Sequence, residues 1–219
     1  MHSSNNRLNT NFQILYFLVG SCHTTDGAYF ILKDLREDRS NALKMTKTTL
    51  LKNKAKKLSA SRALNSPDEV EILLAEADLA ELEAVEDTFN NTVKAASEEL
   101  EFIEECIRRI EPHRKYSHVP DSEASEISQR EEWRLELINR AENCLITSGT
   151  IPIDEFNTMR MHPDFKSSIL PEITNIKQCI EDGRVQDRLF PENVTQIRQL
   201  IESEEIKNLL ENKTLPLIE

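Results

Sequence analysis

The sequence is poor in glycine, in aromatic residues and in apolar residues as a whole. Only four of its 219 residues are glycine, one is tryptophan, and aromatic residues make up 5% of the chain. So few glycines argue against nucleotide-binding α/β folds and all-β folds, which need glycine for phosphate-binding loops and tight turns. The hydrophobic fraction of 38% lies below the roughly 45–50% typical of globular domains. We therefore expect long helices with a large solvated surface instead of one large core.

Motifs of metal and redox sites are also missing. The four cysteines are far apart and form no CxxC pair; they are Cys22, Cys106, Cys144 and Cys179. Isolated cysteines on apolar helix faces are usually small buried hydrophobes. No spacing of nucleophile, histidine and carboxylate indicates a catalytic set or a metal site, so we predict no enzymatic activity, no metal and no cofactor. We expect a cytoplasmic protein with reduced thiols.

The N-terminal residues 1–27 differ from the rest of the chain, and we predict that they form a flexible or loosely docked arm. Their apolar run, FQILYFLV, is far shorter than the roughly 20 residues of a membrane span. Two alternatives stay open. Residues 19–22 resemble a lipoprotein cleavage box, which would make the protein an exported lipoprotein held at a membrane by a lipid on Cys22. Alternatively, translation starts at Met45 and residues 1–44 are not part of the native protein.

The clearest element is a long helix from about residue 67 to residue 111. Ser66 and Glu69 have the spacing of a capping box at its start, and no proline or glycine interrupts it. Twelve positions repeat with gaps of three and four, and only Glu86 among them is polar. These positions are Ile72, Ala75, Leu79, Leu82, Glu86, Phe89, Val93, Ala96, Leu100, Ile103, Ile107 and Ile110. A sustained 3.5-residue repeat predicts a coiled-coil seam.

Charge predicts what this helix packs against. Residues 67–111 contain fifteen acidic and three basic residues, whereas residues 28–64 contain ten basic and three acidic ones. Because a short breaker separates two segments of opposite charge, we predict an antiparallel helical hairpin over residues 28–111. Burial of the apolar seam supplies its stability, and charge selects its orientation. The apolar residues of the first helix do not follow a clean heptad.

A second region follows the hairpin. Residues 112–122 lie between two prolines and are predicted to be a linker. Prolines at helix starts and glycines at helix ends predict a small compact helical domain over residues 123–211, followed by a tail at residues 212–219. The predicted fold is therefore all-α, a long antiparallel hairpin followed by a compact helical domain.

These features favour a non-enzymatic interaction or assembly protein whose partner is another protein, a second copy of itself included. One alternative is a nucleic-acid accessory protein that contacts phosphates through the basic first helix. Its candidate contacts are Lys52, Lys54, Lys56, Lys57 and Arg62. Another alternative is an acidic inhibitor that mimics DNA through the second helix. In the competing interpretation, the basic residues of the first helix only flank the acidic helix or are exposed to solvent.

Overall fold

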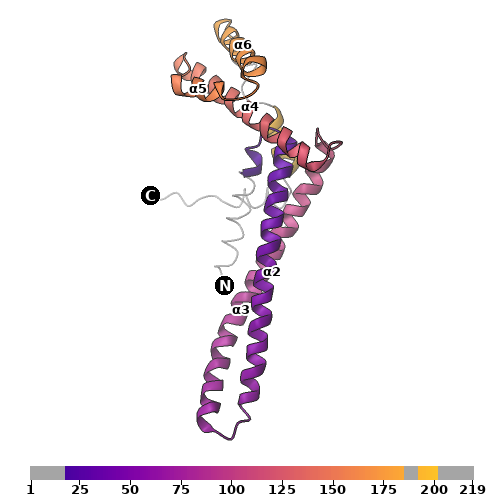
Figure 1. Cartoon of the computed structure of the whole chain (residues 1–219), viewed down its shortest axis with the longest axis vertical. Coiled ribbons are helices and arrows are strands. Elements are labelled where there is room, and N and C mark those ends of the chain that lie inside the picture. Colours follow the sequence, from indigo (N-terminus) through magenta and orange to yellow (C-terminus); the bar gives the residue numbers. More distant parts are fainter. Residues whose placement is uncertain (1–17, 185–191, 202–219) are drawn as a thin grey trace, which may run out of the picture. The chain divides into compact units, whose positions relative to one another are not determined.

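The computed structural model describes residues 18–184 and 192–201, and the regular structure in this part of the chain is helical throughout (Figure 1). The α-helices are α2 (Thr25–Ala63), α3 (Glu69–Ile110), α4 (Asp121–Ser148), α5 (Ile153–Arg160), α6 (Leu170–Glu181) and α7 (Glu192–Ile201). The all-α prediction is confirmed. The described residues divide into two units: residues 32–107 form one, and residues 18–31 together with those from 108 onward form the other.

Within residues 32–107, α2 and α3 lie side by side as a helical hairpin (Figure 1). In the ion pairs between the two helices, residues early in α2 pair with residues late in α3. Arg39 Nε lies 2.9 Å from Glu99 Oε1, and Lys57 Nζ lies 3.0 Å from Glu83 Oε1. The helices are therefore antiparallel, as predicted, and their opposite charges face each other.

The turn between the two helices differs from the predicted capping box. Helix α3 begins at Glu69, and Asp68 accepts a hydrogen bond from the backbone N–H of Val70 at 2.9 Å. The Ser66 hydroxyl accepts the Asp68 N–H at 3.2 Å and donates to the Glu71 carboxylate at 2.5 Å. The prediction that Ser66 and Glu69 cap each other is wrong, because Ser66 bonds to Asp68 and Glu71 instead of Glu69. Asp68 takes this role, and its charge suits a helix N-terminus.

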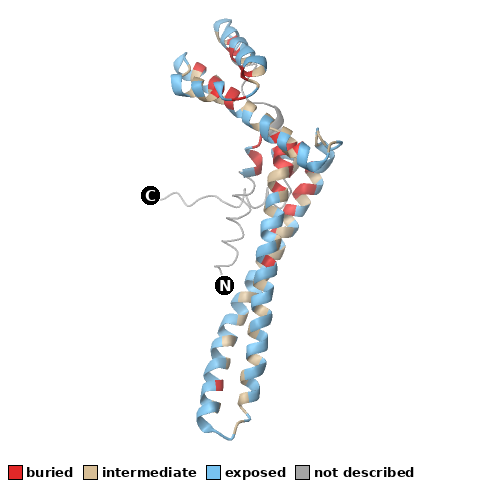
Figure 2. Cartoon of the chain, in the orientation of Figure 1, coloured by how far each residue is buried: buried red, intermediate tan, exposed pale blue. Residues whose placement is uncertain are grey.

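The shielded face of α3 follows the predicted repeat. Between residues 71 and 94, the residues of α3 that are not exposed are Ile72, Ala75, Leu79, Leu82, Glu86, Phe89 and Val93. Further along, Leu100 is half-buried, and Ile103, Ile107 and Ile110 are buried. Figure 2 shows the partly buried positions of the hairpin as tan bands and the buried ones as red bands between pale-blue, exposed stretches. Because only Ala75 of the first seven is fully buried, the seam stays partly open to water toward the turn.

The shielded face of α2 follows a repeat that its apolar residues alone do not show, in keeping with the prediction that those residues hold no clean heptad. Between residues 41 and 62, the residues that are not exposed are Leu43, Thr46, Leu50, Asn53, Lys57 and Ala60. Their gaps are again three and four, but half of them are polar, so a count of apolar residues does not detect the repeat. Conversely, Met45, Leu51 and Leu58 on the same helix are exposed. The hairpin therefore packs an apolar face of α3 against a half-polar face of α2.

Residues 18–27 are packed, which differs from the predicted loose arm. Val19 is fully buried, and the backbone N–H of His23 donates to the Glu132 carboxylate of α4 at 2.9 Å. The physical reason is that the first N–H groups of a helix lack partners within the helix, and the chain entering α2 finds its acceptor on α4. Residues 1–17 of the predicted arm lie outside the described residues.

Helices α4, α5 and α6 share a small core with the π-helical turn Phe165–Ile169. Its buried members are Leu137, Ile138, Ala141, Leu145, Met159, Phe165, Ile169, Ile173 and Ile176. Gly149 ends α4 with φ of 72°, a conformation that glycine adopts without strain, and its N–H donates to the Leu145 carbonyl at 3.0 Å. The end of the predicted domain, residues 202–211, and the predicted tail lie outside the described residues.

Candidate functional site

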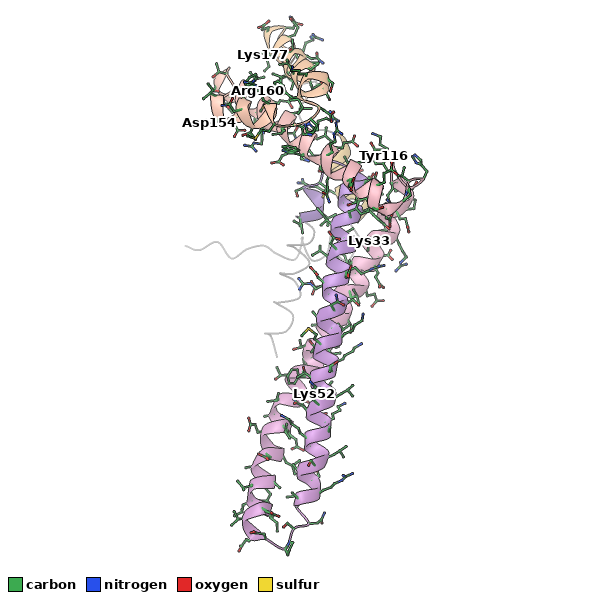
Figure 3. All side chains as sticks on the ribbon, in the orientation of Figure 1. Lys33, Lys52, Tyr116, Asp154, Arg160 and Lys177 are labelled. Carbon is green, nitrogen blue, oxygen red and sulfur yellow. The ribbon has the colours of Figure 1, made fainter. Side chains whose placement is uncertain are left out.

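The five basic residues predicted as phosphate contacts do not form one surface. A helix turns by about 100° per residue, so Lys52 and Lys56 share one side of α2 while Lys54 and Lys57 share another. Figure 3 labels Lys52 on this helix. Lys52, Lys56 and Arg62 are exposed, and Lys57 is half-buried in the seam. The set is therefore divided between two edges of the hairpin and its outer surface.

One pair of these lysines is engaged by α3. Lys57 Nζ lies 3.0 Å from the Glu83 carboxylate and 3.2 Å from that of Glu86, and Lys54 Nζ lies 4.0 Å from Glu86. The hydrogen bonds that Lys57 donates to Glu83 and Glu86 raise its pKa above the ordinary value. Glu86, the polar residue of the α3 repeat, thus has its partners on α2. These two lysines neutralise carboxylates of their own hairpin, as the competing interpretation of the basic run expects.

A groove of about 790 Å³ runs between α2 and α3 close to the turn, on the edge that carries Lys56. Its α2 wall is made of small and polar residues: Asn53, Lys56, Ser59, Ala60 and Ala63. Its α3 wall has larger apolar side chains among acidic ones: Glu71, Leu74, Ala75, Asp78, Glu81, Leu82 and Val85. Leu74 is 62% exposed and Val85 is 37% exposed. The groove therefore has a basic wall of small residues and an acidic wall of larger apolar residues.

Of the charged residues that line this groove, Glu71 accepts the Ser66 hydroxyl, and the other three are not paired within the hairpin. Among the described residues, Lys56 has no ion-pair partner, and the same holds for Asp78 and Glu81. On the other edge, in contrast, Lys54 and Lys57 pair with carboxylates of α3. One edge of the hairpin is thus closed by ion pairs, and the other stays open.

A second set of exposed apolar residues lies outside the groove and is called here the outer apolar set. It consists of Leu51 and Leu58 on α2 and Val70 and Leu73 on α3, each more than 60% exposed. Leu51 and Leu58 are seven residues apart and therefore share a helix face. Val70 and Leu73 are three residues apart near the start of α3 and share a face of that helix. Each helix of the hairpin thus leaves one pair of apolar side chains exposed.

In the other unit, the half-buried carboxylate of Glu132 closes the start of α2. Glu132 accepts the backbone N–H of Thr24 at 2.6 Å and its hydroxyl at 2.6 Å, besides the N–H and the ring Nδ1–H of His23. The amide of Asn139 lies 2.7 Å from His23 Nε2. Burial disfavours the charged form of Glu132, but the hydrogen bonds from His23 and Thr24 outweigh it and lower the pKa of this carboxyl. All these contacts serve to cap and orient the helix.

Cys22 lies next to this cap but is not an activated thiol. Its side chain is buried, and burial, with a smaller contribution from the charge of Glu132, raises the pKa of Cys22 to about 12. A nucleophilic cysteine needs the opposite shift. The position gives no support to nucleophilic catalysis, and a buried side chain gives none to the lipid-modified alternative.

A fully buried carboxylate, that of Asp26, orders the turn after α3, within the predicted linker. Asp26, 1% exposed, accepts the backbone N–H of Lys115 at 2.8 Å and the Nε–H of Arg114 at 3.2 Å. The Arg114 guanidinium lies 3.9 Å from the centroid of the Tyr29 ring. Tyr116, labelled in Figure 3, donates its hydroxyl to Glu131 at 2.9 Å. These residues are structural partners of one another, and the segment is an ordered turn.

Comparison with known proteins gives no assignment: no family model, no curated protein and no solved structure matches this chain. Among the described residues, no group of three or more histidine, cysteine or acidic side chains is placed to hold a metal ion. The described helices also include none with the length and apolar character that crossing a bilayer requires. The surface of the hairpin is the strongest indication of function.

Proposed function

We propose that this protein is a non-enzymatic interaction or assembly module that acts through protein–protein contacts of its hairpin. The observation that carries the proposal is the outer apolar set, Leu51, Leu58, Val70 and Leu73, which the hairpin leaves more than 60% exposed. Burying one such side chain in an interface contributes about 1.5–3 kcal/mol. A partner that covers several of them gains enough to bind specifically.

The partly open seam supports the same proposal. Toward the turn, most residues of the α3 repeat are only half-buried, and the α2 face opposite them includes polar residues such as Asn53. Two helices alone therefore bury little apolar area here. Further helices packed against the pair would complete the burial, as they do in helical bundles.

The nucleic-acid alternative is less well supported. Lys54 and Lys57 pair with carboxylates of α3, and the net charge of the chain is −12, so the molecule as a whole repels phosphate. We expect no shift of duplex or single-stranded DNA in a gel-shift titration, even at low salt. Binding that weakens steeply as salt rises would contradict this expectation and favour the alternative.

The proposal is tested by removing apolar surface from the outer face of α2. We expect the double variant Leu51→Gln/Leu58→Gln to weaken partner binding by at least about tenfold, because the two buried side chains together account for more than 1.4 kcal/mol. The measurement is affinity capture from a lysate of the source cells with the full chain as bait, quantified by mass spectrometry, with bound copies of the chain itself counted as a partner.

The matched control is Thr48→Gln, an exposed position on the same helix. It should retain all partners, and circular dichroism should show equal helix content in the three proteins. Val70→Gln/Leu73→Gln repeats the test on α3. If the native chain retains no protein beyond those retained by the two double variants, the outer apolar set is not a contact surface and the proposal that it carries fails.

A further inference from the structure

We infer that the groove between α2 and α3 takes a second copy of this chain, so that two hairpins form a four-helix bundle with its twofold axis parallel to the helices. This inference rests on the proposed function and names the partner. It concerns the groove residues and not the outer apolar set, so this inference and the proposed function can fail separately.

Charge decides between the two closed ways in which the groove edges can meet. With the twofold axis perpendicular to the helices, α2 faces α2 and α3 faces α3. That arrangement places Lys56 opposite lysines, and Asp78 and Glu81 opposite carboxylates. With the axis parallel to the helices, each basic wall faces the acidic wall of the other copy. Like charges disfavour the first arrangement and opposite charges favour the second.

The register of the hairpin brings the opposite charges within reach. Inside one chain, Lys57 is level with Glu83 and Glu86, to which it is bonded. A twofold axis parallel to the helices preserves height, so Lys56 of one copy is about one helical turn from the level of Glu81 of the other. One turn is about 5.4 Å, a distance that a lysine side chain spans. Lys56 and Glu81, unpaired within one chain, thereby gain partners in the dimer.

The sizes of the side chains match in the same arrangement. The α2 wall offers Ser59, Ala60 and Ala63, and the α3 wall offers Leu74 and Val85. When α3 of one copy faces α2 of the other, large apolar side chains meet small ones, which lets two helices approach closely. The perpendicular arrangement would instead set large against large and small against small. Shape and charge therefore select the same geometry.

The test uses single charge reversals and their mixture in the full-length chain. We expect the native chain to be a dimer by sedimentation equilibrium. Lys56→Glu and Glu81→Lys should each raise the dissociation constant of the dimer by about tenfold or more, because the twofold axis makes each new repulsion occur at two places in the interface. Mixing the two variants should restore native affinity, since each reversed charge then faces its opposite on the other chain. Rescue between chains cannot arise from folding within one chain.

The matched control is Lys47→Glu, which makes the same charge change at an exposed position of α2 outside the groove and should leave the dimer intact. Leu74→Gln tests the apolar contact without a change of charge and should also weaken the dimer. A monomeric native chain overturns the inference, and so does a dimer that both reversals leave unchanged. A monomer that still captures another protein through the outer apolar set would leave the proposed function standing.

Discussion

Replacing Asp26 by alanine is expected to lower the free energy of unfolding by about 3–5 kcal/mol, the usual cost of removing one partner of a buried ion pair. Of its two aspartate partners, the Arg114 side chain, which is 5% exposed, would keep Asp121, which is itself 44% exposed. The backbone N–H of Lys115 would also lose its acceptor. Chemical denaturation followed by circular dichroism measures the change.

Asp38→Ala is the matched control, because this aspartate is an exposed residue of the same helix. Substitutions at such positions usually change stability by less than about 0.5 kcal/mol. Equal stability of the Asp26 and Asp38 variants would contradict the role given to Asp26. We also expect the Asp26 variant to be cleaved more readily by a protease after residues 114–116, because that turn loses its anchor.

Replacing Glu132 by glutamine is expected to destabilise the protein by about 2–3 kcal/mol at neutral pH, because the amide group faces N–H donors that the carboxylate had accepted. The pKa of Glu132 is lowered in the folded state from its ordinary value of 4.5. The unfolded chain therefore binds a proton at this group at a higher pH than the folded chain does. The stability it contributes is present above about pH 4.5 and is lost as pH falls through the lower folded pKa.

The glutamine variant lacks this titration, so its unfolding free energy should change less between pH 5 and about pH 3 than that of the native protein. Glu126→Gln, an exposed position on the same helix, serves as the control and should keep the native pH profile. Gly27→Ala offers an independent check, since a Cβ there would come within 2.7 Å of Glu132 Cδ and push the carboxylate off the helix start. Identical pH profiles for the native protein and the Glu132 variant would rule out this cap.

The hairpin could be predicted from the sequence because both signals for it, the apolar repeat and the opposite charges of two neighbouring segments, are local. The repeat from Ile72 to Ile110 is a property of one helix, and all of its positions are shielded in α3. The α2 repeat was missed because polar residues, Thr46, Asn53 and Lys57, occupy half of its positions. Polar side chains are tolerated there because the seam stays partly open to water. A pattern of apolar residues alone cannot detect such a face.

The groove and the buried caps could not be predicted, for a different reason. Each depends on residues far apart in the chain, such as His23 and Glu132, which are separated by 109 positions. The sequence around either residue gives no indication that the two are in contact. The basic run was visible in the sequence, but only the register of the hairpin shows that Lys57 is paired and Lys56 is not.

The division of the chain into units has a consequence for the order of folding. The hairpin, residues 32–107, is inserted into the other unit, whose described residues come from 18–31 and from 108 onward. During synthesis, residues 18–31 are made before α4, so the Glu132 carboxylate can cap α2 only after α4 has been made. The hairpin has mostly local contacts and closes early, which shortens the effective loop between residues 31 and 108 and lowers the entropy cost of joining them. A variant that slows hairpin closure should therefore delay burial of Cys22, even though that thiol belongs to the other unit.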